Sequence, residues 1–72
     1  MPQDRPSQAQ LLTQLRYAIE LEQQSYRRYT EAAKLTRDEK VRKLLRYLAK
    51  QELTHEEKLR NLLGELEAAQ GD

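Results

Sequence analysis

Three ionisable residues in this 72-residue sequence have the types and the spacing of metal ligands: Glu22, Glu52 and His55. His55 comes three residues after Glu52, so these two side chains would share one face of a helix. Each of the three interrupts a row of apolar residues, where an unpaired carboxylate is costly to bury. Two carboxylates and one imidazole form an oxygen-rich ligand set that suits Fe(II) or Mn, with Zn able to compete. The spacing therefore indicates a metal-binding site.

The apolar rows around these residues predict two long helices. In the second half of the chain, steps of four and three residues from position 41 to position 66 form a heptad pattern, in which only Glu52 and His55 are not aliphatic. In the first half, a similar row from position 12 to position 33 has one charged member, Glu22. The remaining members are Leu12, Leu15, Ile19, Tyr26, Tyr29, Ala33, Val41, Leu45, Leu48, Leu59, Leu62 and Leu66. Both rows have the period of an amphipathic helix.

Helix-breaking residues are confined to the two ends of the chain, because both prolines precede residue 7 and the first glycine is Gly64. Thr36, followed by Glu39 three residues later, has the spacing of a capping box, and Gly64 is a candidate C-cap. The fold class expected is all-α, an antiparallel two-helix hairpin. The expected segments are a disordered stretch over 1–6, a helix over about 7–35, a turn over about 36–38, a helix over about 39–63, and a tail or short helical extension over 64–72.

The predicted hairpin brings the two glutamates together. The midpoint between Glu22 and Glu52 is residue 37, in the turn, so each glutamate lies about 22 Å of helix rise away from it. One hairpin then supplies two carboxylates and one imidazole, which is half of the ligand set of a di-metal carboxylate site in a four-helix bundle. A second copy would supply the other half. We therefore expect a homodimeric four-helix bundle.

Size and composition also favour a partner subunit. A chain this short, with only 38% apolar residues, buries a small core and usually needs a disulfide, a metal or a second subunit. The absence of cysteine excludes disulfides and thiolate metal sites. Two other interpretations of the ionisable residues stay open. A histidine in an apolar row can fix the register of a dimeric hairpin that is a non-enzymatic interaction module, and a bundle can bind metal without turnover.

Charge is unevenly distributed along a chain whose net charge is only +1. Residues 34–50 carry seven basic and two acidic side chains, whereas residues 51–72 carry two basic and six acidic ones. The near-neutral total gives no general reason to expect nucleic-acid or membrane binding. No apolar run approaches the length of a membrane span, and the first residues lack the apolar core of a signal peptide. We expect a soluble, cytoplasmic protein.

The residues around the predicted site resemble a known family. The stretch Ala18-Ile19-Glu20-Leu21-Glu22, the residues Tyr26, Tyr29 and Ala33, and the stretch Leu48-Ala49-Lys50-Gln51-Glu52-Leu53-Thr54-His55 are similar to the rubrerythrin-like branch of the ferritin-like superfamily. Most members carry two such hairpins in one polypeptide. With a single hairpin, this chain looks like the encapsulated ferritins, in which a di-iron site forms across a subunit interface.

The resemblance implies a role for each site residue. Glu22 would be a terminal iron ligand, Glu52 would bridge two irons, and His55 would bind through one ring nitrogen. Tyr29 matches a tyrosine near the family's site, where it would act as a catalytic residue that hydrogen-bonds a ligand or donates an electron; the other interpretation is a core aromatic. The activity implied is ferroxidase-type oxidation of Fe(II), in iron storage or oxidative-stress protection, with two iron ions per dimer and Mn or Zn as substitutes.

The resemblance also implies partners. Encapsulated ferritins form rings of dimers inside an encapsulin shell, a protein nanocompartment, to which a short Gly- and Leu-containing C-terminal peptide docks them. This chain ends Ala68-Ala69-Gln70-Gly71-Asp72 and shows no such peptide. A homodimer is therefore expected, a larger ring follows only from the resemblance, and the encapsulin shell stays an open expectation.

Overall fold

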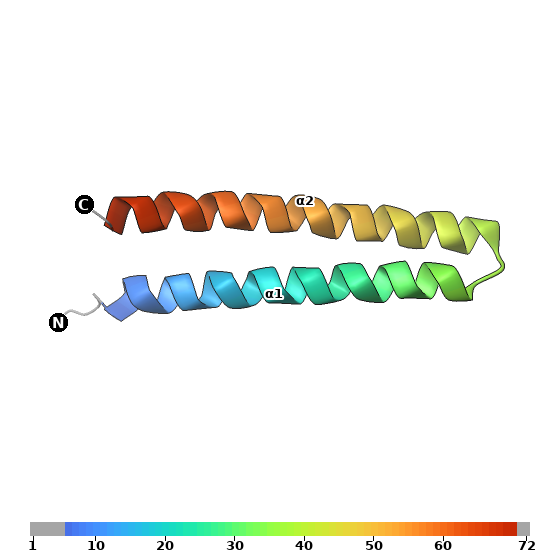
Figure 1. The fold of residues 1–72 in the computed structure, drawn as a ribbon, viewed down its shortest axis with the longest axis horizontal. Helices are drawn as coiled ribbons and strands as arrows, with labels where there is room; N and C mark the ends of the chain where they lie inside the picture. Colours follow the sequence, from blue (N-terminus) through green and yellow to red (C-terminus); the bar gives the residue numbers. More distant parts are fainter. Residues whose placement is uncertain (1–5, 71–72) are drawn as a thin grey trace.

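The computed structural model describes residues 6–70, which form a helical hairpin about 56 Å long. Helix α1 spans Pro6–Leu35 and helix α2 spans Glu39–Gln70, and the two lie antiparallel along their whole length (Figure 1). The predicted all-α hairpin is therefore confirmed. Apart from Pro6, the stretch over 1–6 that was expected to be disordered lies outside the described residues. Pro6 suits the first turn of a helix, where its missing N–H would have no intrahelical acceptor.

The turn over residues 36–38 is closed by Asp38, which is the N-cap of α2. Its Oδ1 accepts hydrogen bonds from the backbone N–H of Lys40 at 2.9 Å and of Val41 at 3.2 Å. The predicted capping role of Thr36 is wrong, because α2 begins at Glu39 and the residue just before it supplies the cap. The hydroxyl of Thr36 instead accepts the backbone N–H of Asp38 at 3.1 Å and supports the turn.

Arg42, near the start of α2, links this helix to the connecting turn and to the end of α1. Its guanidinium donates to the backbone carbonyls of Thr36 at 2.6 Å and Ala33 at 3.3 Å, and it also pairs with Glu39. These bonds satisfy the carbonyl of Ala33 in the last turn of α1, which has no intrahelical partner, and the carbonyl of Thr36 just after the helix. The position at which α2 leaves the turn is therefore fixed by polar contacts as well as by the cap.

Helix α2 continues through Gly64 to Gln70, so the expected C-cap at Gly64 is wrong. Gly64 has no left-handed backbone conformation, and a Cβ placed on it would meet nothing within 4 Å. The residues after it are good helix formers. Leu66 is half-buried and Glu67 pairs with Arg16 of α1, so the last turns of α2 contact α1. The segment after residue 63 is therefore a helical extension at least as far as Gln70.

The core of the hairpin is thin. Among residues 8–69, whose side chains are described, the buried apolar residues are Leu12, Leu15, Ile19, Ala33 and Ala49. Larger apolar side chains remain exposed at nine positions, among them Leu44, Tyr47 and Leu62. Two helices can bury only one stripe of each other, so much of the apolar surface of this chain stays open to solvent. Over residues 6–70, neither helix has a stretch apolar enough to cross a membrane.

Helix α1 covers only one edge of the apolar row that the sequence predicts on α2. The α2 positions that are buried or half-buried are 42, 45, 48, 49, 52, 56, 59, 63 and 66. The predicted row shares 45, 48, 52, 59 and 66 with this set, but its other members Val41, His55 and Leu62 are exposed. We call the strip formed by Val41, His55 and Leu62 the open edge. His55 contacts Glu22 of α1, so the open edge lies on the side of the hairpin on which Glu22 also emerges.

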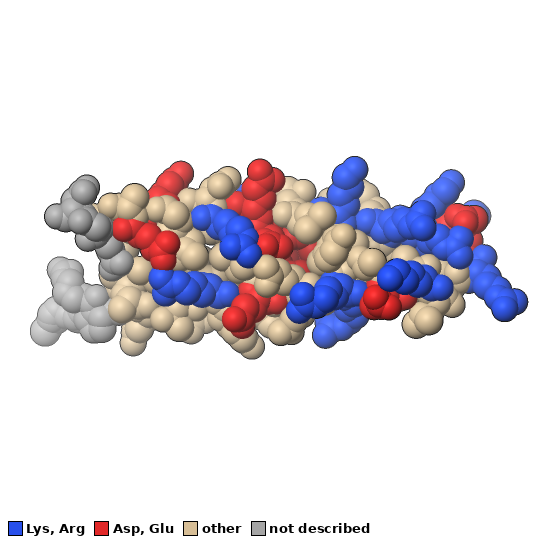
Figure 2. Space-filling view, in the orientation of Figure 1, with Lys and Arg blue, Asp and Glu red and all other residues tan. Residues whose placement is uncertain are grey.

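Polar contacts join the two helices elsewhere. Arg16 pairs with Glu67 near the free ends, and Gln23 donates to Glu56 at 3.1 Å about halfway along the hairpin. Figure 2 shows a face on which basic and acidic side chains lie beside one another along both helices, while basic side chains gather at the turn end. The hairpin thus combines ion-paired surface with an apolar edge.

Candidate metal centre

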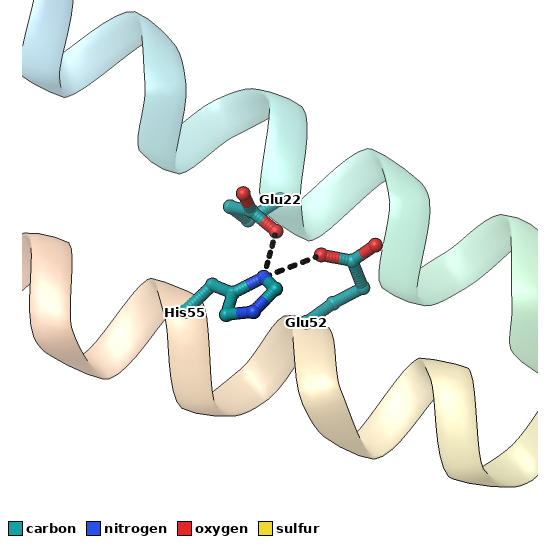
Figure 3. A group of neighbouring side chains, drawn as sticks. All are labelled: Glu22, Glu52 and His55. Carbon is teal, nitrogen blue, oxygen red and sulfur yellow. Dashed lines mark hydrogen bonds and ion pairs between the residues drawn. The ribbon is translucent and has the colours of Figure 1, made fainter.

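Glu22, Glu52 and His55 meet halfway along the hairpin, as their spacing predicts. One potential ligand atom from each residue lies within 4.8 Å of those of the other two. Glu22 comes from α1, whereas Glu52 and His55 come from α2, and all three side chains point toward one another between the helices (Figure 3). The equal distance of the two glutamates from the turn brings them to one level, and one helical turn separates Glu52 from His55.

A single ring nitrogen of His55 faces both carboxylates. Its Nδ1 lies 3.4 Å from Oε1 of Glu22 and 3.3 Å from Oε1 of Glu52. The three side chains differ in exposure, with 17% for Glu52, 25% for Glu22 and 51% for His55. The carboxylates are thus partly withdrawn between the helices and the imidazole sits at the open edge. A metal ion could therefore reach the carboxylates from the side of the open edge.

The carboxyl group of Glu52 perturbs that of Glu22. The Glu52 carboxyl raises the pKa of Glu22 above its ordinary value, because it can share a proton with Glu22 and because it repels the ionised form. Partial burial raises the pKa of Glu22 further, while the neighbouring His55 acts in the opposite direction. The cluster therefore carries more negative charge than its own imidazole compensates. A site with this imbalance favours a cation or a proton.

One atom of the cluster lacks a partner. Oε1 of Glu22 is buried and accepts no hydrogen bond, since its contact with His55 Nδ1 is only an ion-pair approach at 3.4 Å. A buried carboxylate oxygen without a donor is costly. Together with the oxygen-rich donor set, this orphaned oxygen fits a bound metal ion, and Glu22, Glu52 and His55 are the side chains that would hold it.

Tyr29 stands apart from this group. It lies two helical turns beyond Glu22 on α1, about 10 Å along the helix axis, and its side chain is half-buried. Among the described residues, the cluster of potential metal ligands does not include Tyr29. A catalytic role for Tyr29 stays a prediction.

A second polar group beside the centre was not expected from the sequence. Glu56 follows His55, and its Oε2 accepts hydrogen bonds from Arg60 Nε at 2.8 Å and from Gln23 Nε2 at 3.1 Å. The bond from Arg60 is the main cause that lowers the pKa of Glu56; partial burial opposes it, and the bond from Gln23 acts with Arg60. Because Gln23 follows Glu22, this contact clamps the two helices next to the ligand residues. The four-residue spacing of Glu56 and Arg60 was the only sequence signal for it.

An antiparallel hairpin that brings two glutamates and a histidine together defines the class of carboxylate–histidine helical proteins to which di-iron proteins belong. A family model described as Rubrerythrin matches residues 7–71, nearly the whole chain. The chain belongs to the rubrerythrin family, within the ferritin-like group. This membership links it to di-iron carboxylate proteins and to iron binding in general. No curated protein and no solved structure matches the chain.

Proposed function

We propose that two copies of this chain bind two iron ions between them and oxidise Fe(II). The observation that carries the proposal is the convergence of Glu22, Glu52 and His55 around a buried carboxylate oxygen that has no hydrogen-bond donor. Membership of the rubrerythrin family supports iron as the metal. Mn and Zn suit the same donor set and are the expected substitutes.

The ligand count favours a homodimer. One hairpin offers two carboxylates and one imidazole, which are too few for two metal ions. Two hairpins offer four carboxylates and two imidazoles, the set used by di-metal carboxylate bundles, and four carboxylates balance the charge of two divalent cations. One hairpin therefore provides half of a di-metal site, and a second copy of the same chain would complete it.

The open edge supplies a place for that copy. Val41 and Leu62 are 43% and 42% exposed on the strip that also presents His55. On α1, Leu11 is likewise exposed and lies in a row of three- and four-residue steps that passes through Glu22. A second hairpin packed on this side would bury these apolar side chains and bring its own ligand residues to the first set. Rings of such dimers and an encapsulin shell remain expectations from the resemblance.

Each ligand residue has a distinct part in the proposal. Glu22 would be a terminal ligand, Glu52 would bridge and His55 would bind through a ring nitrogen. Bound Fe(II) supplies the electrons: two Fe(II) ions give two electrons, which together with two protons reduce one O2 to hydrogen peroxide or one peroxide molecule to two waters. Glu22, Glu52 and His55 would hold and orient the ions.

Anaerobic loading with Fe(II) tests this proposal. We expect a dimer by sedimentation or native mass spectrometry, two irons per dimer, and an increase in near-ultraviolet absorbance when air or peroxide is added. Glu52→Gln should lose iron binding, whereas Glu57→Gln, an exposed carboxylate on the same stretch of α2, should keep it.

The other outcomes separate the remaining interpretations. A dimer that binds iron but shows no oxygen-dependent change would be a metal-binding bundle without turnover. A dimer whose iron content and stability ignore Glu52→Gln would be an interaction module in which the ionisable residues set register. A chain that stays monomeric with iron present would contradict the shared site.

A further inference from the structure

A groove between the helices lies in the half of the hairpin nearest the turn. Its volume is about 310 Å³, and its floor includes Ala33 of α1 and Ala49 of α2. Both alanines are buried and both line the groove, where larger side chains would have filled part of the space. Leu53 and the ring of Tyr26 extend the apolar lining. The hollow is therefore a direct result of small residues at the helix contact.

The groove opens on a different side from the metal centre. Leu53 lines the groove and His55 lies on the open edge, and two residues along an α-helix correspond to a rotation of 200°. None of the three ligand residues of the metal centre lines the groove. A ligand in the groove would therefore leave the open edge and the metal centre free.

The lining of the groove is positively charged. Lys34 of α1 and both Arg46 and Lys50 of α2 border it, and the residues that line it include no acidic side chain. Among residues 8–69, Arg46 and Lys50 form no ion pair, and Lys34 has only an exposed contact with Glu31 at 3.4 Å. Arg42, by contrast, is bonded to two carbonyls and to Glu39. The cations around the groove are thus available to a ligand.

We propose that this groove binds a small organic anion, with an apolar ring or chain on the alanine floor and an anionic head group on Arg46, Lys50 and Lys34. Tyr26 and Thr30 line the same groove, and their hydroxyl groups can donate hydrogen bonds to the head group. The volume lies at the lower end of the range for ligand pockets, so one ring or a short chain fits and a macromolecule does not. The cations on both helices favour an anionic head group, and the alanine floor favours an apolar ring or chain.

The 72-residue chain without metal allows a direct test by NMR titration. Phenyl phosphate serves as the probe, inorganic phosphate as the head group alone and phenol as the body alone. We expect saturable shifts of the Ala33, Ala49 and Leu53 methyl groups with phenyl phosphate, and at least about tenfold weaker binding of either fragment. The proposal does not depend on iron, so failure here leaves the proposed function unaffected.

Four variants separate the contributions to binding. Arg46→Gln and Lys50→Gln should each weaken phenyl phosphate binding about fivefold to tenfold, because each removes a charged donor. Lys58→Gln removes an exposed cation outside the groove and should leave binding unchanged. Ala49→Leu should abolish binding by filling the floor, provided that circular dichroism shows the native helix content. Equal binding of all three compounds, shifts confined to residues of the open edge, or equal effects of Lys50→Gln and Lys58→Gln would each overturn the proposal.

Discussion

Oε1 of Glu22 on α1 lies 3.4 Å from Nδ1 of His55 on α2, and the same nitrogen lies 3.3 Å from Oε1 of Glu52. One imidazole nitrogen thus faces both carboxylates of the candidate centre. A metal ion held by the three residues would compete with this contact and with any proton that the carboxyl pair retains. Metal affinity and pH are therefore linked at this site.

Glu22→Gln should stabilise the metal-free protein at pH 7. The pKa of Glu22 is raised in the folded chain, so the folded state binds more protons than the unfolded state between the ordinary value of 4.5 and the raised value. Stability from this group is therefore lost as pH rises through that interval, and Gln removes the loss. Thermal melts at fixed protein concentration should show a higher midpoint for the variant at pH 7 and a difference that shrinks toward pH 4.5. Glu20→Gln, at an exposed position on α1, is the control and should show neither effect.

Zn(II), which has no redox chemistry, should stabilise the wild-type chain by mass action. At a hundredfold excess over its dissociation constant, the expected gain is about 2.7 kcal/mol. His55→Ala and Glu52→Gln should remove most of this gain because each deletes a ligand. Thermal melts with and without Zn(II), with Glu57→Gln as the matched variant, check the assignment. A gain that survives in Glu52→Gln would place the metal elsewhere.

Glu56→Gln should destabilise the hairpin at pH 7 by about 0.5–1 kcal/mol, because it removes the charge that Arg60 and Gln23 hydrogen-bond. The pKa of Glu56 is lowered in the folded chain, so its contribution is present above the ordinary value of 4.5 and is lost as pH falls through the lowered value. Urea titrations at pH 7 and at acid pH should show the variant approaching wild type in acid. A constant difference across pH would contradict this account.

Asp38→Ala should cost about 1 kcal/mol, since it leaves the N–H groups of Lys40 and Val41 without their acceptor. Thr36→Ala should cost less, because it removes one bond within the turn and no helix cap. Urea titrations of the two variants check the order. The reverse order would restore Thr36 as the capping residue.

Gly64→Ala should stabilise the protein by roughly 0.5–1 kcal/mol. Gly64 lies inside α2 without a left-handed backbone conformation, and the added Cβ meets no atom within 4 Å. The gain should appear in thermal melts without a change in metal content. A loss of stability would show that this position contacts a second chain.

The convergence of Glu22, Glu52 and His55 could be predicted because it depends on quantities that the sequence contains: the position of the turn, the rise of a helix and a three-residue spacing. The sequence does not decide which residue caps α2, because Thr36 and Asp38 are both good N-cap residues. The first residue of α2 decides between them, and the helix begins just after Asp38. The predicted end of α2 at Gly64 is wrong for a related reason. Helix formers on both sides of it and the contacts of Leu66 and Glu67 with α1 outweigh a single glycine.

The features that the sequence could not predict depend on which side chains meet across the hairpin. A heptad row does not reveal which of its two edges α1 covers, so the exposure of Val41, His55 and Leu62 could not be read from the spacing. The groove requires Ala33 and Ala49 to lie on the same side of the hairpin, and the bond from Gln23 to Glu56 depends on their heights along two separate helices. Such relationships depend on the rotation of each helix about its own axis.

The equal distance of Glu22 and Glu52 from the turn makes the stretch between residues 22 and 55 a molecular ruler of fixed length. One inserted residue on either arm would turn the following ligand by 100° and move it 1.5 Å along the axis, out of reach of its partners. Residues added before position 22 or after position 55 leave the ruler unchanged. Changes of chain length that leave the metal centre intact are therefore confined to the stretches before Glu22 and after His55, and the start of α1 and the end of α2 lie side by side opposite the turn (Figure 1).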